Sequence, residues 1–218
     1  MPAHRIMIVD DHPLFRGALR QSLTSAFDAC IEEADSLDVL SEKLAALESV
    51  DLIVLDLSMP GVQGFSGLLF LRAQYPEVPV VVCSANDDVA VIRRCIEFGA
   101  AGYVPKSQPV ERIREAVTTV LSGGVWTPPD LNLTGEPDRE TEALVGRLAT
   151  LTPQQVRVLM MLGEGLLNKQ IAYKLSVSEA TIKAHVSAIL QKLGVDSRTQ
   201  AVIAINKIDG GAWEKLAG

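Results

Sequence analysis

Hydrophobic residues over the first 125 positions alternate between short continuous runs and longer segments with helical spacing. Five short runs predict β-strands, over residues 6–9, 29–33, 52–55, 78–83 and 102–104. Apolar residues three to four positions apart predict five helices, over residues 13–25, 37–47, 65–74, 89–98 and 110–121. Strands that alternate with helices are typical of an α/β fold with a doubly wound parallel sheet. The near-continuous apolar strands indicate a five-stranded sheet that is covered on both faces.

The pattern changes after residue 121, where turn-forming residues replace the periodic ones. Glycine and proline pairs, such as Gly123-Gly124 and Pro128-Pro129, predict a linker over residues 126–149, which a short helix over 139–148 closes. From residue 150 to 218 the spacing is helical and predicts four helices, over residues 153–162, 168–175, 178–193 and 197–206. Two short helices joined by a tight turn in so small a unit predict a helix-turn-helix.

Two of these helices begin with a capping-box sequence, in which a hydroxyl residue stands three positions before a glutamine. Thr152 with Gln155 is the first such pair, and Ser197 with Gln200 is the second. The chain is therefore expected to contain an α/β domain over residues 1–125, a linker over 126–149 and an all-α domain over 150–218.

Composition is that of an ordinary globular protein, with 48% hydrophobic and 22% charged residues among 218. A net charge of -7 argues against a protein that coats nucleic acid by bulk attraction, if that charge is evenly spread. It is not, because residues 1–125 carry a net -7, residues 126–149 a net -3 and residues 150–218 a net +3. The small basic excess of the helical domain predicts weak DNA binding by a monomer, which dimerisation would strengthen.

Membrane, secreted and metal-thiolate proteins are disfavoured by other features. Apolar runs such as Val78–Cys83 are too short to span a bilayer, and no signal-peptide core follows Met1. A cytoplasmic protein with no membrane partner is therefore expected. The three cysteines, Cys30, Cys83 and Cys95, lack metal-binding spacing and are interpreted as reduced core thiols.

Residues suited to phosphoryl transfer stand at the ends of four predicted strands. Asp10 and Asp11 follow the first strand, Asp56 follows the third, Ser84 ends the fourth and Lys106 follows the fifth. Ligands of such sheets bind beyond the carboxyl ends of the strands, so these side chains should converge if the first and third strands are neighbours. Clustered carboxylates need a cation, and hard oxygen ligands suit Mg²⁺. Asp56 is then the candidate nucleophile, while Mg²⁺ and Lys106 neutralise the phosphoryl oxygens.

Residues 6–121 resemble a response-regulator receiver domain, which has a flavodoxin-like fold. The resemblance is carried by Asp10-Asp11, Asp56-Leu57-Ser58-Met59-Pro60-Gly61 with Gly64, Ser84-Ala85 and Tyr103-Val104-Pro105-Lys106. It implies that Asp56 is the phosphoacceptor, that Asp11, Asp56 and the Ser58 backbone carbonyl bind Mg²⁺ directly, and that Asp10 acts through water. It also implies that Ser84 bonds the phosphoryl group while Tyr103 turns inward and reshapes the face formed by the fourth helix and the fifth strand. In that family the positions of Ser58 and Asn86 influence how water reaches the aspartyl phosphate.

An aspartate-based phosphatase of the haloacid-dehalogenase type is the rival chemistry on a similar fold. That class needs a second aspartate two residues after the nucleophile as general acid, and Ser58 occupies that position. The chain is therefore expected to accept a phosphoryl group without being an enzyme, apart from slow autodephosphorylation. Taken singly, Asp10 or Asp11 fits equally well as a cap of the next helix, but five such residues at four strand ends favour a site.

The helix predicted over residues 178–193 has one apolar face and one polar face. Its spacing places Ile182, Val186, Ile189, Leu190 and Leu193 in the core and leaves Lys183, Ala184, Ser187 and Gln191 outward. Such a helix can enter the major groove, with its first turns on base edges and nearby basic residues on phosphates. The predicted DNA-binding residues are Lys169, Ser178, Thr181, Lys183, Ala184, His185, Ser187, Lys192 and Arg198.

The helical domain resembles the LuxR-type helix-turn-helix. The matching segments are Leu151-Thr152-Pro153, Asn168-Lys169-Gln170-Ile171-Ala172, Thr181-Ile182-Lys183-Ala184-His185-Val186 and Lys192-Leu193-Gly194-Val195. With its receiver, the whole chain is similar to a NarL/FixJ-type response regulator. Gln155 replaces the usual glutamate, and Ala184 and Ser187 replace bulkier or basic residues, which bears on the target sequence rather than on the binding mode. In this family the fourth helix commonly forms the dimer contact on DNA, which implicates Ala201, Val202 and Ile205.

The resulting hypothesis is a two-component transcriptional regulator in which a partner sensor histidine kinase phosphorylates Asp56. Phosphorylation should release the DNA-binding domain or favour a homodimer on paired half-sites of double-stranded DNA, with RNA polymerase as a further partner. Two alternatives stay open. In one, DNA binding is constitutive and the receiver serves only for dimerisation or docking. In the other, the first domain senses a small molecule, which the strand-end aspartates disfavour.

Overall fold

The computed structural model describes residues 4–59, 64–131 and 139–208 of the chain. It divides into two compact units, Met1–Leu133 and Thr134–Gly218. Pro60 and Gly61 of the motif that starts at Asp56 lie outside the described residues. Within the described ranges, no helix is both long enough and apolar enough to cross a membrane.

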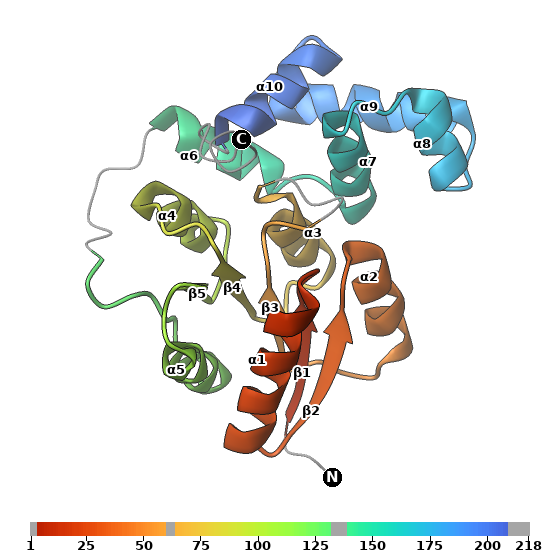
Figure 1. Cartoon of the computed structure of the whole chain (residues 1–218). Coiled ribbons are helices and arrows are strands. Elements are labelled where there is room, and N and C mark those ends of the chain that lie inside the picture. Colours follow the sequence, from red (N-terminus) through yellow and green to blue (C-terminus); the bar gives the residue numbers. More distant parts are fainter. Residues whose placement is uncertain (1–3, 60–63, 132–138, 209–218) are drawn as a thin grey trace. The chain divides into compact units, whose positions relative to one another are not determined.

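The first unit is built on a five-stranded parallel sheet in the order β2-β1-β3-β4-β5 (Figure 1). Its strands are β1 (His4–Val9), β2 (Ala29–Ala34), β3 (Leu52–Leu55), β4 (Val80–Ser84) and β5 (Gly102–Pro105). The predicted doubly wound sheet is thus confirmed. β2 is an edge strand whose first five residues are only half-buried, which explains why its apolar pattern is weak.

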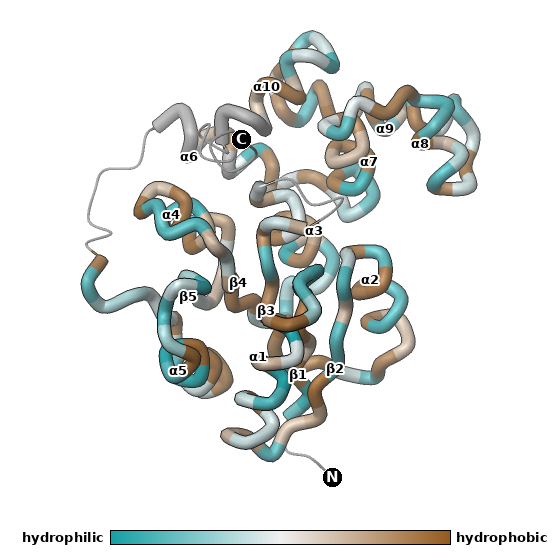
Figure 2. The backbone as a smooth tube through the Cα atoms, viewed as in Figure 1, coloured by the Kyte–Doolittle hydropathy of each residue, from teal (hydrophilic) through white to brown (hydrophobic). Residues whose placement is uncertain are grey.

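Five helices of this unit cover both faces of the sheet: α1 (Pro13–Ala26), α2 (Leu37–Ala46), α3 (Ser66–Gln74), α4 (Val89–Glu97) and α5 (Val110–Leu121). On one face, α1 and α5 bury Leu19 and Ile113 in the same cluster as Ile6 of β1. The alternate strand residues, such as Met7 and Ile53, point to the other face and are equally buried, as a sheet covered on both faces requires. Figure 2 shows hydrophobic residues concentrated in β3 and β4.

The order of the strands decides where the functional residues of this unit lie. From β1 the chain winds first to β2 and then to β3 on the other side of β1, so β1 and β3 meet at the topological switch point. Val9 pairs with Leu55, and the N–H of Asp56 donates to the carbonyl of Val9 across the two strands (2.8 Å). Asp10 and Asp56, which follow these strands, therefore leave the sheet side by side.

In residues 139–208, the described part of the second unit, the regular elements are all helices, as predicted. Its described helices are α6 (Arg139–Leu148), α7 (Pro153–Gly163), α8 (Asn168–Lys174), α9 (Glu179–Leu193) and α10 (Arg198–Ile208). α9 contacts all four of the others and buries Ile182, Ile189 and Leu193 among them. α8, a tight turn and α9 form the predicted helix-turn-helix.

Both ends of the predicted linker are attached to a domain. In the first unit, the N–H of Trp126 donates to the carbonyl of Ala101 (3.0 Å), and the N–H of Tyr103 donates to the carbonyl of Trp126 (3.1 Å). In the second unit, Nη1 of Arg147 on α6 donates to the carbonyl of Leu193 at the end of α9 (3.1 Å). α6 therefore contributes to the helical domain instead of serving only as a connection.

The two predicted capping boxes differ in the structure. Thr152 and Gln155 form the complete box, since each side chain bonds the backbone N–H of the other. At α10, the hydroxyl of Ser197 accepts the N–H of Gln200 (3.2 Å), but Oε1 of Gln200 accepts the N–H of Asp196 (2.7 Å). The second box is therefore incomplete, because the glutamine side chain bonds the N–H of the residue before the cap and not that of Ser197.

The turn between α8 and α9 contains a residue in the left-handed region, Ser176, with φ of 53°. A Cβ atom is unfavourable there by about 1 kcal/mol, which glycine avoids. We expect Ser176→Gly to raise the free energy of unfolding of the helical unit by about 0.5–1 kcal/mol, measured by urea denaturation of the full chain. Ser122→Gly, at a helix end with φ of -85°, is the control and should give no gain. Equal or lower stability of Ser176→Gly would contradict the reason given.

Candidate functional site

An acidic cluster occupies the switch point at the carboxyl ends of β1 and β3. Asp10 is 2% exposed and Asp56 is 1% exposed. Nζ of Lys106 lies 2.7 Å from Oδ2 of Asp10 and 2.8 Å from Oδ2 of Asp56. Lys106 follows β5, two strands away from β3, so its long side chain reaches across the end of β4 to form both contacts. The structure thus brings together three of the strand-end residues that the sequence nominated.

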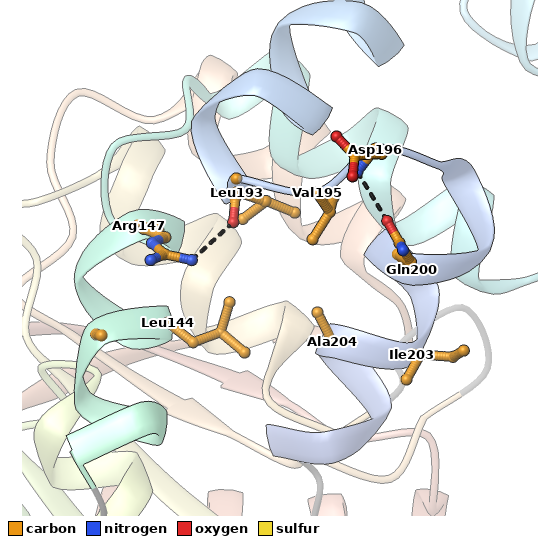
Figure 3. Close-up of a pocket in the computed structure, with 10 residues that line it drawn as sticks. Leu144, Arg147, Leu193, Val195, Asp196, Gln200, Ile203 and Ala204 are labelled. Carbon is orange, nitrogen blue, oxygen red and sulfur yellow. Dashed lines mark hydrogen bonds between the residues drawn. The ribbon is translucent and has the colours of Figure 1, made fainter.

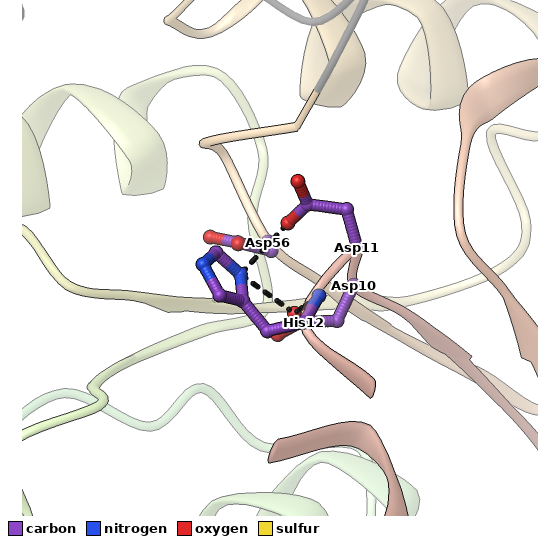
Figure 4. A group of neighbouring side chains, drawn as sticks. All are labelled: Asp10, Asp11, His12 and Asp56. Atoms are coloured by element: carbon purple, nitrogen blue, oxygen red, sulfur yellow. Dashed lines mark hydrogen bonds and ion pairs between the residues drawn. The ribbon is translucent and has the colours of Figure 1, made fainter. Parts of the chain in front are cut away.

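Asp11 and His12 complete this cluster on its more exposed side. Figure 4 shows the side chains of Asp10, Asp11, His12 and Asp56 directed toward one another. One ligand atom from each of the four lies within 4.8 Å of the others. The backbone N–H of His12 donates to Oδ1 of Asp10 (2.8 Å), which orients that carboxylate. His12 was not among the predicted site residues, although it directly follows the two aspartates in the sequence.

The electrostatics of the cluster favour a divalent cation. Burial raises the pKa of Asp56, and the hydrogen bond and positive charge of Lys106 only partly oppose this effect. Burial also acts to lower the pKa of Lys106, but its hydrogen bonds to Asp10 and Asp56 outweigh burial and raise it. Lys106 thus pairs with both Asp10 and Asp56, while Asp11 adds a third carboxylate to the cluster, so negative charge is in excess. Carboxylate oxygens are ligands that Mg²⁺ prefers. Oδ1 of Asp11 is shielded from solvent and lies 2.7 Å from Nδ1 of His12.

Two residues of α1 hold the basic and acidic partners in place. The ring of Phe15 lies under Nζ of Lys106, 4.6 Å from the ring centroid, a cation–π contact. Nη1 of Arg16 donates to the backbone carbonyl of Asp10, and Nε of the same side chain donates to Glu33 (2.9 Å). Sequence reasoning missed both residues because nothing in their spacing relates α1 to the end of β5.

The predicted switch residues, Ser84 and Tyr103, are both fully buried on adjacent strands. The hydroxyl of Ser84 accepts the N–H of Asn86 (3.3 Å), and the hydroxyl of Tyr103 donates to the carbonyl of Asn86. Burial raises the pKa of Tyr103, so its hydroxyl stays a donor at physiological pH. Tyr103 therefore faces inward in this structure and ties β5 to the segment between β4 and α4.

The helical unit presents the outward face of α9 that the periodicity predicted. Lys183, Ala184, Ser187 and Gln191 are exposed, while Val186 and Leu190 on the opposite face are half-buried. Near the start of α9, the hydroxyl of Ser178 accepts the N–H of Thr181 (3.0 Å) and caps the helix. His185 is half-buried, and Lys169 is exposed on α8. The exposed residues of α9 form a largely polar surface along the helix, from its N-cap Ser178 to Gln191 near its end.

Two of the predicted DNA-binding residues, Lys192 and Arg198, form hydrogen bonds within the helical domain. Nζ of Lys192 donates to the carbonyl of Thr150 and to Oε1 of Gln155, both at 2.8 Å. Nη2 of Arg198 donates to the carbonyl of Leu166 (2.6 Å) beyond the end of α7. Both cations therefore connect parts of the helical domain, and their contact with DNA stays a prediction.

Ala201 is 0% exposed, so its assignment to a dimer contact is wrong: the side chain packs into the core of its own domain. Ile203, which is 49% exposed, is an outward apolar residue of α10 that the prediction missed. Val202 is half-buried, and the side chain of Ile205 lies outside the described residues. The predicted dimer contact therefore stays on α10, with Ile203 in place of Ala201.

A pocket of about 350 Å³ lies between α6, the turn after α9 and α10 (Figure 3). Leu144, Ile203 and Ala204 face it from the two helices, and Arg147 and Gln200 border it with the hydrogen bonds described above. None of its lining residues belongs to the predicted DNA-binding set. The pocket lies near the C-terminal end of α9, while the predicted base contacts lie near its N-terminal end.

Both domains match known families. Residues 6–118 match the family described as "Response regulator receiver domain", and residues 149–205 match "Bacterial regulatory proteins, luxR family". A glycerol metabolism activator from Pseudomonas putida is 40% identical over 217 residues, which cover 96% of this chain and 98% of that protein. The nitrate/nitrite response regulator NarP of Escherichia coli (strain K12) is 33% identical and covers 91% of this chain and 93% of that protein.

A solved structure with the same domain order is RcsB from Salmonella enterica serovar Typhimurium, bound to promoter P1flhDC in the presence of the phosphomimetic BeF₃⁻. It is similar with a TM-score of 0.56 and 25% identity, over 93% of this chain and 97% of that chain.

The raised pKa of Asp56 predicts a pH-dependent stability. A carboxyl group whose folded-state pKa exceeds its unfolded value favours folding below the unfolded pKa and loses that contribution as pH rises through the folded pKa. In metal-free buffer near neutral pH, Asp56→Asn should therefore raise the free energy of unfolding by about 1 kcal/mol, the usual scale for relieving one uncompensated buried group. The gain should shrink as the pH approaches 4.

Urea denaturation of the full chain at several pH values checks this expectation. Asp28→Asn is the control, since Asp28 is exposed. A variant at Asp56 that is less stable than wild type at neutral pH would show that the bond to Lys106 outweighs burial.

Proposed function

The chain belongs to the response regulators that join a receiver domain to a LuxR-type DNA-binding domain, and we propose that phosphorylation of Asp56 controls its binding to DNA. It is a two-component transcriptional regulator by family. The observation that carries the proposal is the convergence of the buried Asp10 and Asp56 carboxylates on Lys106 at the switch point. That arrangement places one carboxylate, Asp56, beside a cation that can neutralise an incoming phosphoryl group.

A partner sensor histidine kinase supplies the phosphoryl group in this proposal. A carboxylate oxygen of Asp56 attacks phosphorus, and the bond from phosphorus to the kinase imidazole nitrogen breaks as the imidazole leaves. Lys106, already within 2.8 Å of Asp56, neutralises charge on the transferred oxygens. Ser58 stands where a phosphatase would place its general acid, so the chain acts as an acceptor and not as a turnover enzyme.

The oxygen atoms of the cluster fit Mg²⁺ as the metal of this step. Asp11, Asp56 and the backbone carbonyl of Ser58 would hold it directly, and Asp10 would hold it through water. When bound, Mg²⁺ shields the negative charge of the phosphoryl oxygens. The N–H of Ser58 donates to Oδ1 of Asp56 (3.2 Å), which fixes the carboxylate in the orientation from which its other oxygen can react.

The response to phosphorylation passes through Ser84, Asn86 and Tyr103 in our proposal. Ser84 would turn its hydroxyl toward the phosphoryl group, which competes with the N–H of Asn86 for that oxygen. The carbonyl of Asn86 also accepts a hydrogen bond from the Tyr103 hydroxyl. A shift of the segment that contains Asn86 would therefore change the surface between α4 and β5. Support comes from the burial of Ser84 and Tyr103 on neighbouring strands.

DNA binding is assigned to the outward face of α9 in the major groove. Lys183, Ala184 and Ser187 would face base edges, while Lys169, Ser178, Thr181 and His185 would contact phosphates or the groove wall. A homodimer formed through α10, where Ile203 is exposed and Val202 is half-buried, would present two such helices to paired half-sites; Ile205 stays a predicted member of that contact. A protein that binds the chromosome in this way acts in the cytoplasm, with RNA polymerase as a downstream partner.

The phosphoacceptor is tested with a small acyl phosphate donor and Mg²⁺. We expect wild type to acquire a phosphoryl label that hydroxylamine releases, as an acyl phosphate requires, and to bind DNA more tightly, and Asp56→Asn to lose both effects. Asp51→Asn is a matched control, because Asp51 is an exposed aspartate at the other end of β3. Labelling that persists in Asp56→Asn would refute the acceptor. If labelled wild type binds DNA with the same affinity as wild type without the donor, the result would favour constitutive DNA binding.

The DNA interface is tested by changing one exposed cation of α9. Lys183→Ala should weaken binding to a duplex selected by wild type by about tenfold and should reduce the preference for that duplex over an unrelated one, because Lys183 would face base edges. Its i,i+4 pair with Glu179 is exposed and contributes little to folding. Lys174→Ala removes the same charge from α8, where Nζ faces Glu164, and should have a smaller effect. Equal effects of the two variants would argue for bulk attraction only.

A further inference from the structure

His12 is the member of the acidic cluster that the proposed function leaves without a role. It occupies the N-cap position of α1, yet its side chain makes no capping hydrogen bond to that helix. Its Nδ1 lies instead 2.7 Å from Oδ1 of Asp11 and 3.4 Å from Oδ1 of Asp10. In Figure 4 the imidazole ring is turned toward the three carboxylates. The side chain therefore contributes to the cluster and not to the helix start.

The shorter of these separations matches that of ligand atoms that share one ion. Two donors bound at about 2.1 Å and at right angles stand about 3 Å apart. The distance from Nδ1 to Oδ1 of Asp11, which binds the ion directly in the proposed function, is 2.7 Å and is close to that value. The imidazole is 64% exposed, so it closes the solvent side of a site whose floor is formed by the buried Asp10 and Asp56.

We propose that His12 is a nitrogen ligand of the cation site and that this site binds Co²⁺ and Mn²⁺ more tightly than Mg²⁺. The inference rests on the proposed function, in which Asp10, Asp11 and Asp56 form a divalent-cation site. Mg²⁺ prefers oxygen donors and retains its water ligands, whereas an imidazole nitrogen favours first-row transition ions. One imidazole added to an oxygen set changes the selectivity of the site while leaving it able to hold Mg²⁺.

The first experiment compares Co²⁺ with Mg²⁺ by isothermal titration calorimetry of the full-length protein and His12→Gln. Glutamine keeps an N–H that can bond Asp11 but lacks the imidazole ligand. We expect the variant to lose about tenfold or more of its Co²⁺ affinity and to stay within about threefold of wild type for Mg²⁺. His4→Gln is the matched control, because His4 begins β1 at the end remote from the site, and it should change neither affinity.

The second experiment detects the bond itself. Mn²⁺ bound to wild type should show nitrogen-14 modulation from a coordinated imidazole in electron spin-echo spectra, and His12→Gln should lose that signal. Wild type without the modulation, or equal losses of Co²⁺ and Mg²⁺ affinity in His12→Gln, would overturn the proposal and leave His12 as a residue that only orients Asp11.

The two proposals fail in different ways. If wild type binds none of the three ions, the cation site of the proposed function fails and this inference fails with it. If wild type binds Mg²⁺ but His12→Gln matches it for every ion, only the assignment of His12 is refuted.

Discussion

The first domain depends on one costly arrangement, two carboxylates buried side by side at the ends of β1 and β3. Asp10 and Asp56 are removed from water, and like charges at this range disfavour each other's ionised form. Lys106 offsets part of that cost by bonding both carboxylates at once. In the proposed function, the remaining negative charge favours a bound cation, and that cation together with Lys106 then favours a phosphoryl group. The site is thus a local instability that ligands relieve, which is the condition for a switch.

The surrounding contacts are understood as supports of this arrangement. Phe15 lies under the ammonium of Lys106, and Arg16 bonds the backbone of Asp10 while Glu33 holds Arg16. Tyr103 and Asn86 connect the same region to the segment between β4 and α4. A change in charge at Asp56 therefore acts on groups that are bonded to the sheet. A small displacement of these groups can then move the segment between β4 and α4 and alter the surface there.

The sequence sufficed for the fold because local signals agreed with one another. Continuous apolar strands, helical spacing between them and capping residues such as Thr152 all indicate the same elements, and the strand ends then place Asp10, Asp56 and Lys106 together. What it could not supply are contacts that depend on how elements pack. Phe15 is an ordinary apolar position of α1 until α1 is seen beside the end of β5.

The contacts of the second domain that periodicity did not reveal have the same origin. In the sequence, Lys192 and Arg198 look like cations without partners near the recognition helix. The packed domain shows that each donates a hydrogen bond to a backbone carbonyl. On α10, the run Ala201-Val202-Ile203 has no polar residue to mark which side faces outward, so periodicity alone could not tell that Ala201 is buried and Ile203 exposed.

These reassignments strengthen the case for regulation through dimerisation. The helical domain has a net charge of only +3, and two of its cations are engaged within the fold. A single domain then offers few cations to phosphates, and affinity from this source scales with the number of phosphates neutralised. Joining two domains on adjacent half-sites multiplies their weak individual affinities, because the second contact forms at high effective concentration. A receiver that alters only the fraction of dimer can therefore control DNA occupancy without any change in α9 itself.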